Sequence, residues 1–199
     1  MDRFVRLLDR YNAAEAAPAD RAALEKQLWQ QFGRQGAVLI QDMSGFSLFT
    51  RRFGIVHYLA MVRRMQATTQ PIVERQGGEL VKFEADNLFA VFKSVAPAIE
   101  AARRINLEFG RLNLATEDAR DIHVSSGIAY GEYLLVPGHD LFGDCVNLAC
   151  KMGEDLAEKS EILIDARAHE QLGADPGFAL EPARFTVSGL PLEAYRVKG

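Results

Sequence analysis

The chain has 199 residues, of which 48% are hydrophobic and 25% are charged, the balance expected of a soluble globular protein. It carries 23 Lys and Arg residues against 27 Asp and Glu residues. The resulting net charge of −4 at pH 7 argues against binding to nucleic acid or to anionic lipid.

Other classes of protein are excluded by the absence of their usual patterns. Two cysteines cannot build a disulfide framework, and no run approaches the roughly 20 apolar residues of a membrane span. The N-terminus lacks the apolar core of a secretory signal. We therefore expect a cytoplasmic protein with neither nucleic acid nor a membrane as a partner.

Two stretches near the N-terminus have apolar residues at helical spacing, and Pro18 separates them. We expect a helical hairpin over residues 1–34, followed by a main domain over residues 35–199. The hairpin carries no chemical motif, and its apolar stripes could either pack on the main domain or serve a dimerisation or regulatory role. The stripes are formed by Phe4, Leu7, Leu8, Tyr11 and by Leu24, Leu28, Phe32.

The main domain alternates predicted strands with predicted helices. An apolar run over 37–41 predicts a buried strand, and helical spacing over 55–73 predicts a long helix. Within 123–136 we expect two strands around a turn at Gly131. The order β-α-β-β-α-β predicts an α+β fold, a ferredoxin-like sheet with helices on one face and extra C-terminal strands. The other expected elements are strands over 79–85, 88–92 and 161–165, helices around 99–109 and within 139–157, and a β-rich end.

The strand over 79–85 alternates apolar and polar residues with period two, and Asp86 and Asn87 follow as a plausible two-residue turn. In this topology the first strand lies beside the β-hairpin formed by the strands over 79–85 and 88–92. Asp42, at the end of the first strand, would therefore approach Asp86 in the turn of that β-hairpin. One face of this strand would carry Leu80, Lys82 and Glu84, and the other face Val81, Phe83 and Ala85.

Two aspartates flanked by small residues predict a Mg²⁺ site. Mg²⁺ prefers oxygen ligands and takes one or two carboxylates together with substrate phosphates. A pair of such ions can activate an attacking hydroxyl and stabilise a leaving phosphate, and the helix start after Asp42 would favour a triphosphate. From the residues alone, Asp42 could equally be a helix cap and Asp86 a turn residue.

Three separate strings resemble the catalytic domain of class III adenylate and guanylate cyclases, in matching order and spacing. They are DMSGFSLFT over 42–50, GGELVKFEADNLFAVF over 77–92 and HDLFGDCVNLACKM over 139–152. The resemblance covers roughly residues 36–197. It implies an α+β fold of the predicted kind, two Mg²⁺ or Mn²⁺ ions per active site, and a head-to-tail homodimer whose sites form between the protomers.

The resemblance also implies roles for the residues after the first strand. Asp42 and Asp86 match the two metal aspartates, and the carbonyl of Met43 would be a further metal ligand. Ser44, Gly45 and Phe46 match the segment whose backbone amides, chiefly around the last two, hold the phosphates.

Base recognition is implied for Lys82 and Asp140, which match the pair found in adenylate cyclases. A lysine donates to adenine N1 and an aspartate accepts from the N6 amine, whereas guanine needs the opposite polarity at both atoms. Without the resemblance, Lys82 would be an ordinary solvated lysine and Asp140 a loop residue or a cap.

Asn147 matches the catalytic asparagine that orients the ribose, and Lys151 stands where the family usually has arginine. Lysine cannot reproduce the planar fork of a guanidinium, so charge stabilisation at the α-phosphate is expected to be weaker. Two further departures are Ala85, where glycine is usual, and Ser188, where a triphosphate-binding lysine is usual.

The resulting prediction is an adenylate cyclase that converts ATP to 3′,5′-cyclic AMP and pyrophosphate. The alternatives are a cyclase that uses GTP or a pyrimidine nucleotide, and a weakly active module that binds nucleotide and regulates a partner. A diguanylate cyclase or polymerase-palm relative is disfavoured, because the second string reads Glu84-Ala85-Asp86 without an adjacent Gly-Gly before an acidic pair.

Overall fold

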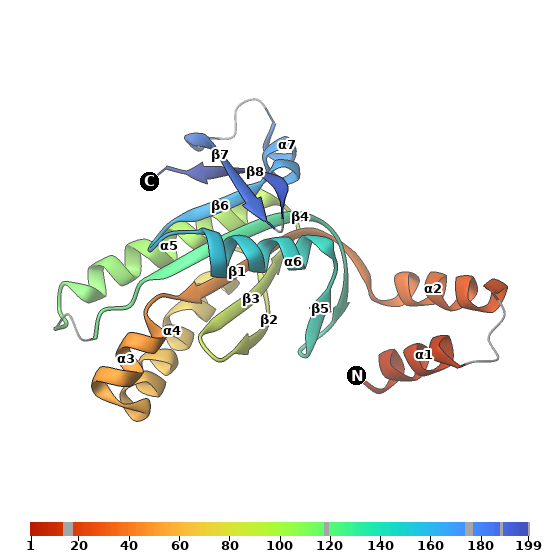
Figure 1. The fold of residues 1–199 in the computed structure, drawn as a ribbon, viewed down its shortest axis with the longest axis horizontal. Coiled ribbons are helices and arrows are strands. Elements are labelled where there is room, and N and C mark those ends of the chain that lie inside the picture. Colours follow the sequence, from red (N-terminus) through yellow and green to blue (C-terminus); the bar gives the residue numbers. More distant parts are fainter. Residues whose placement is uncertain (14–17, 118–119, 174–176, 188, 199) are drawn as a thin grey trace.

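A computed structural model of the chain describes residues 1–13, 18–117, 120–173, 177–187 and 189–198, with the side chains of 46–49, 187 and 190 outside the description. Within these residues an eight-stranded sheet forms the centre of the molecule, and a pair of helices projects from one side of it (Figure 1). None of the described helices is both long enough and apolar enough to cross a bilayer.

The two N-terminal helices, α1 (Asp2–Asn12) and α2 (Pro18–Phe32), are present as predicted. They bury Phe4 and Leu7 against Leu24 and Leu28, a cluster separate from the two cores of the sheet. The cluster continues onto the sheet at Val136, which is 1% exposed. The chain then passes from α2 directly into the first strand.

The predicted ferredoxin-like unit forms the first half of the sheet, with strands in the order β2-β3-β1-β4 and antiparallel neighbours. Further strands extend this order through β6 and β8 to β7, and β5 pairs with β4. The expected β-rich C-terminal end is formed by β7 and β8, which pair as an antiparallel hairpin. The strands are β1 (Gly33–Met43), β2 (Glu79–Glu84), β3 (Asn87–Phe92), β4 (Val124–Val136), β5 (Asp140–Phe142), β6 (Ile162–Asp165), β7 (Leu180–Val187) and β8 (Leu190–Val197).

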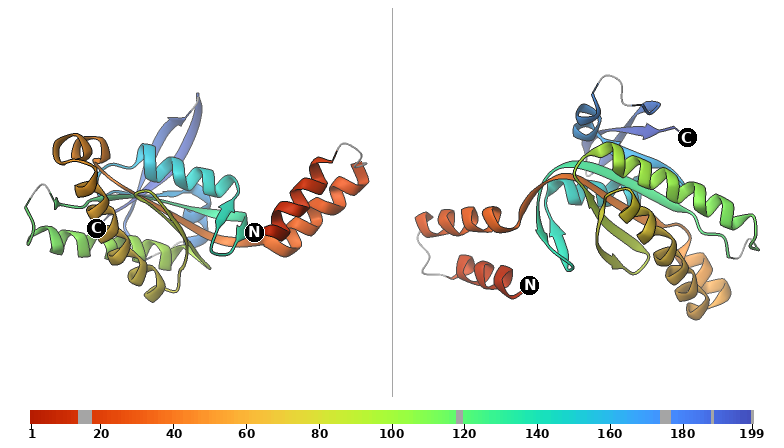
Figure 2. Two further views of the ribbon diagram at one scale, coloured as in Figure 1. Left: turned by 90° about the horizontal axis from the view of Figure 1, so that it is seen from below. Right: turned by 180° about the vertical axis from the view of Figure 1, so that it is seen from behind.

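The sheet buries a core on each face, and this differs from the expectation that the helices lie on one face only. One core packs α4 and α5 against the sheet, and the other packs α6 and the following π-helix against the opposite face (Figure 2). The α+β class itself is confirmed. The helices of the main domain are α3 (Phe46–Phe53), α4 (Ile55–Arg75), α5 (Val95–Asn113), α6 (Asp144–Cys150), the π-helix η2 (Lys151–Leu156) and α7 (Ala166–Leu172).

The predicted turn at Gly131 is wrong, because β4 runs through this position without interruption and Gly131 pairs with Gly36 of β1. The glycine has a packing role instead. A Cβ atom at position 131 would lie 3.1 Å from the Cβ atom of Cys145, so its absence lets α6 approach the strand closely.

The hairpin between β2 and β3 differs from the prediction in two respects. Its turn consists of Ala85 and Asp86, one residue earlier than expected, because Glu84 pairs with Asn87. The even alternation of the strand is also interrupted, since a bulge places Val81 and Lys82 together opposite one residue of β3. Lys82 therefore does not share a strand face with Leu80.

Candidate active site

Asp42 and Asp86 meet at one end of the sheet. Asp42 pairs directly with Asn87 in the ladder between β1 and β3, and Asp86 is the residue before Asn87 in the turn. Alternation along β1 places Asp42 on the same face as Ile40, the face that η2 covers. The predicted proximity of the two aspartates is thus a consequence of the register of the strands.

The local charge at this position is strongly negative. Burial, followed by the nearby charges of Asp86 and Glu154, raises the pKa of Asp42 from 3.8 to about 7. Burial and the charge of Asp155 also raise the pKa of Glu154. Carboxylates that share one partly buried position disfavour each other's ionisation, so the arrangement favours a cation that would neutralise them.

Glu154 and Tyr58 belong to this group of side chains and were missed by the sequence reasoning. Glu154 accepts a hydrogen bond of 3.0 Å from the side-chain amide of Asn87. Tyr58 projects from α4 next to both aspartates, and burial together with the charge of Asp86 raises the pKa of its hydroxyl. Tyr58 lies on α4 and Glu154 on η2, and neither belongs to a sequence motif that would have indicated a functional role.

Two glycines bring η2 down onto the sheet. A Cβ atom at Gly127 of β4 would lie 2.1 Å from the carbonyl oxygen of Ala149, and one at Gly153 would lie 2.9 Å from the carbonyl oxygen of Ile40. Glycine at both positions allows the helical segment to touch the strand backbones. Glu154 follows Gly153 directly, and this close approach places it beside Asp42.

The residues present fit a divalent cation of the magnesium type. Two carboxylates suffice for Mg²⁺ when substrate phosphates complete its coordination, and Asp42 and Asp86 supply them. The carbonyl of Met43 lies at the end of β1, next in the chain to Asp42. In the described part of the chain no group of three or more His, Cys, Asp or Glu side chains could hold a metal without such help.

The segment predicted to bind phosphate begins with a sharp change of direction. Gly45 has a φ of 101°, which glycine adopts without strain, and α3 starts at Phe46. The amide of Ser44 donates a 2.9 Å hydrogen bond to the carbonyl of His123 and is therefore already occupied. The amides from Gly45 onward and the hydroxyl of Ser44 remain the candidates for phosphate contacts, and the side chain of Phe46 lies outside the description.

Lys82 and Asp140 form the predicted pair. The ammonium nitrogen of Lys82 lies 3.0 Å from Oδ1 of Asp140 and 2.6 Å from Oε2 of Glu84. It also lies 4.6 Å from the centre of the Phe89 ring. Burial alone would lower the pKa of Lys82, but the hydrogen bonds to Glu84 and Asp140 outweigh burial and raise it. Lys82 is therefore a fixed cation and not a freely solvated strand residue.

The two residues predicted to act on the ribose and the α-phosphate lie on α6 and η2. Asn147 is exposed, and Lys151 forms a 2.7 Å ion pair with Asp155. Among the described side chains no hydrogen bond or ion pair joins either residue to Asp42 or Asp86. The position of Ser188 lies outside the described residues.

Cys145 and Cys150 are packing residues of the core under α6. Both are free thiols, and burial is the main cause that raises the pKa of each to about 11. A thiol with a raised pKa is a poor nucleophile and a poor metal ligand at neutral pH.

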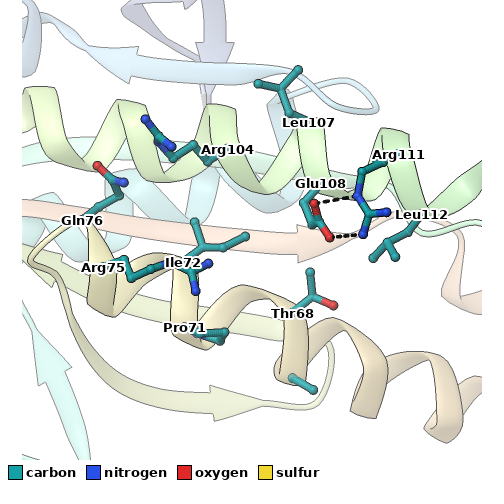
Figure 3. A pocket seen from close by; sticks show the side chains of 11 residues that line it. Thr68, Pro71, Ile72, Arg75, Gln76, Arg104, Leu107, Glu108, Arg111 and Leu112 are labelled. Atoms are coloured by element: carbon teal, nitrogen blue, oxygen red, sulfur yellow. Dashed lines mark hydrogen bonds and ion pairs between the residues drawn. The ribbon is translucent and has the colours of Figure 1, made fainter.

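A separate hollow of about 970 Å³ lies between α4 and α5 (Figure 3). Arg104 and Arg111 line it, but their guanidinium groups are paired with Glu100 and Glu108. It contains neither the aspartates nor Lys82, and we assign the candidate site to the sheet face under η2 instead.

Comparison with known families identifies the class of protein. Residues 30–199 match the family model described as the adenylate and guanylate cyclase catalytic domain. The chain therefore belongs to this family, a family of nucleotidyl cyclases, and the resemblance inferred from the three strings is confirmed.

Relatives agree with this assignment. The chain is 28% identical over 157 residues to an adenylate cyclase of Streptomyces coelicolor, covering 79% of this chain and 39% of the relative. It is also 28% identical over 137 residues to putative adenylate cyclase 3 of Rhizobium meliloti, covering 69% of this chain and 23% of the relative. The chain thus spans only 23% to 39% of the length of these relatives.

Solved structures show the same fold. The adenylyl cyclase CyaB from P. aeruginosa superposes with a TM-score of 0.72 at 18% identity, covering 84% of this chain and 96% of that one. The catalytic core of a rhodopsin-guanylyl cyclase with converted specificity, in complex with ATPαS, gives a TM-score of 0.70 at 20% identity, covering 83% and 98%.

Proposed function

We propose that this chain is a nucleotidyl cyclase that converts ATP to 3′,5′-cyclic AMP and pyrophosphate. The observation that carries the proposal is the convergence of two pairs on one sheet: the adjacent aspartates Asp42 and Asp86, and the ion pair between Lys82 and Asp140. The first pair suits the metal ions of a triphosphate, and the second suits the edge of adenine.

In the proposed reaction the ribose 3′ hydroxyl gives up its proton to solvent and its oxygen forms a bond to the α-phosphorus. The bond from that phosphorus to the bridging oxygen breaks, and pyrophosphate leaves. Two Mg²⁺ or Mn²⁺ ions, held by Asp42, Asp86 and the carbonyl of Met43, would lower the pKa of the attacking hydroxyl and offset charge on the leaving group. The chain itself would position the substrate, which is the main task in phosphoryl transfer.

Each remaining residue has a positioning or charge-stabilising role in this proposal. Lys82 donates to adenine N1 and Asp140 accepts from the N6 amine. Asn147 orients the ribose, and Lys151 places positive charge at the α-phosphate. The present ion pair between Lys151 and Asp155 would have to open for this, so the rate is expected to be lower than with an arginine fork.

The proposed assembly is a head-to-tail homodimer in which the site is shared between protomers. The exposed position of Asn147, with no contact to the aspartates among the described residues, supports a site completed by a second copy. Mixing equal amounts of Asp42→Ala and Asn147→Ala variants tests this arrangement. If the two residues come from different protomers, mixed dimers regain one intact site, and about a quarter of the wild-type activity returns.

The proposed function is tested by incubating the protein with each of ATP, GTP, UTP and CTP plus Mg²⁺ or Mn²⁺ and resolving the products by mass. Cyclic AMP as the main product supports the proposal. A different cyclic nucleotide would assign another substrate, and no cyclic product from any nucleotide would leave a regulatory module that binds without turnover. ATP and Mg²⁺ are both cytoplasmic solutes, so the proposal also places the domain in the cytoplasm.

A further inference from the structure

The helix α1 contacts the strand that carries Asp140. The ring of Phe4 stacks on the ring of Phe142, with centroids 5.5 Å apart and planes 5° apart. Phe4 also meets Phe32 of α2 edge to face, with centroids 5.1 Å apart. Figure 1 shows the N-terminal end of α1 nearest to β5. Phe142 is thus the point at which the N-terminal helices reach the candidate site.

The strand β5 depends on such contacts because it is short. It has three residues and, in the described part of the chain, pairs only with β4. Gly138, with a φ of 69°, forms part of the turn that joins the two strands. A three-residue edge ribbon has few backbone hydrogen bonds to fix its orientation, so side-chain packing decides it.

The register shows that Asp140 lies on the face that the helices contact. Asp140 pairs with Val136, and Phe142 pairs with Leu134. Directly opposed residues, and residues two apart, point to the same face of a ribbon. Val136 and Leu134 both pack in the cluster formed by α1 and α2, so this cluster supports the ribbon face that presents Asp140.

We propose that Phe4 is a positioning residue for base recognition: by stacking on Phe142 it holds β5 so that Asp140 stays within reach of Lys82. The α1–α2 hairpin then contributes to the nucleotide selectivity of the site through its contact with β5. This inference rests on the proposed function only in that Asp140 reads the base.

The first test replaces Phe4 with leucine, which keeps the apolar contacts of the cluster and removes the ring stack. We expect the ratio of kcat/KM for ATP over GTP to fall by about 2- to 10-fold, the size of an aromatic pair's contribution, with most of the change in the KM for ATP. Arg6→Ala, an exposed change on the same helix, is the matched control and should leave the ratio unchanged. An unchanged ratio in Phe4→Leu would overturn the proposal.

The second test asks whether the effect passes through Asp140. In the Asp140→Ala background, Phe4→Leu should cause no further loss of selectivity, because the residue that it positions is absent. The same full loss in both backgrounds would show that Phe4 acts through general stability instead. Phe4→Leu and Phe142→Leu should likewise be no worse together than singly.

A third measurement does not depend on turnover. The amide of Leu141 donates a 2.8 Å hydrogen bond to Oδ1 of Asp140, so its hydrogen exchange reports the orientation of this carboxylate. We expect faster exchange at Leu141 in Phe4→Leu and no change in Arg6→Ala. Faster exchange in a protein that forms no cyclic nucleotide would reject the proposed function and retain the coupling. Unchanged exchange in Phe4→Leu would reject the coupling.

Discussion

Asp42 of β1 and Asn87 of β3 are directly opposed in the sheet, and this pairing brings Asp86, the turn residue before Asn87, to the candidate site as its second carboxylate. Asn87 also donates a hydrogen bond to Glu154 of η2, the π-helix that covers one face of the sheet. Two strands and a π-helix therefore meet at one acidic point. The charge gathered there has measurable consequences for both stability and chemistry.

The metal-free protein should lose stability as Asp42 ionises. The pKa of Asp42 is raised from 3.8 to about 7 in the folded chain, so the folded state holds an extra proton between these values. The free energy of unfolding therefore falls as the pH rises through this window. We expect Asp42→Asn to raise stability at pH 8 by on the order of 1–2 kcal/mol, allowing for solvent screening of a partly buried group, and to change it little at pH 4.

Thermal unfolding in the presence of a chelator measures this effect at both pH values. Asp9→Asn, on the exposed side of α1, provides a control with the same chemical change. An equal gain at pH 4 and pH 8 would show that the ionisation of Asp42 is not its cause.

Lys82→Glu should weaken the preference for ATP. The substitution reverses the charge that would meet adenine N1 and leaves Asp140 without its cation at 3.0 Å. We expect kcat/KM for ATP to fall by at least about tenfold, since charge-assisted hydrogen bonds are worth about 1.5–3 kcal/mol. Glu84→Gln removes the other, largely exposed partner of Lys82 and should change kcat/KM much less. An unchanged substrate profile in Lys82→Glu would refute its role in base selection.

Lys151→Arg should increase kcat. Arginine can bind the α-phosphate through two parallel hydrogen bonds, whereas lysine offers a point charge that is paired with Asp155 in the free protein. A gain of about tenfold corresponds to one additional hydrogen bond of about 1.4 kcal/mol in the transition state. Steady-state kinetics with ATP provide the measurement. The control Asp155→Asn breaks the ion pair of Lys151 without introducing a guanidinium, so it shows how much of the gain comes from breaking that pair. A fall in kcat would contradict this assignment.

Ala85→Gly should stabilise the β2–β3 turn. Ala85 has a φ of 51°, a left-handed conformation that costs a residue with a Cβ atom about 1–2 kcal/mol. Glycine removes this strain but adds freedom to the unfolded chain, so the net gain should be below about 1 kcal/mol. Chemical denaturation of the two proteins tests the sign, and a loss of stability would contradict the argument.

The exposed side of α1 should contribute to self-association if the hairpin joins two protomers. Val5 and Leu8 are 42% and 36% exposed, although Phe4 and Leu7 on the other side of the helix are buried. We expect the double substitution Val5→Glu and Leu8→Glu to weaken the dimer by at least about tenfold, because it places charges in an apolar contact. Sedimentation across a concentration series measures this, with Arg3→Glu as the charge control. An unchanged association would leave the hairpin with the intramolecular role argued above.

Residue patterns predicted most of the elements that build the site. Helical spacing gave α1, α2 and α4, and the apolar run over 37–41 marked the centre of β1. The closeness of Asp42 and Asp86 could be predicted because it depends on strand order, which the alternation of strands and helices already specifies.

Contacts between layers could not be predicted in the same way. Gly131 was interpreted as a turn because glycine punctuates strands, but the close approach of Cys145 decides its role. Glu154 and Tyr58 reach the aspartates only through helix placement on the sheet. The stack of Phe4 on Phe142 joins residues more than a hundred positions apart, and no periodicity encodes such a pair.

The bulge at Val81 and Lys82 has one more consequence. In a strand without a bulge, adjacent residues point to opposite faces of the sheet, so a core residue and the site residue next to it cannot share a face. Here the bulge gives core packing and site contact to two successive residues: Val81 is buried at 4% exposure, and Lys82 forms the ion pair with Asp140. A substitution at position 82 therefore leaves Val81 in the core, and a cyclase of this architecture could acquire a different base preference there with little change to its hydrophobic packing.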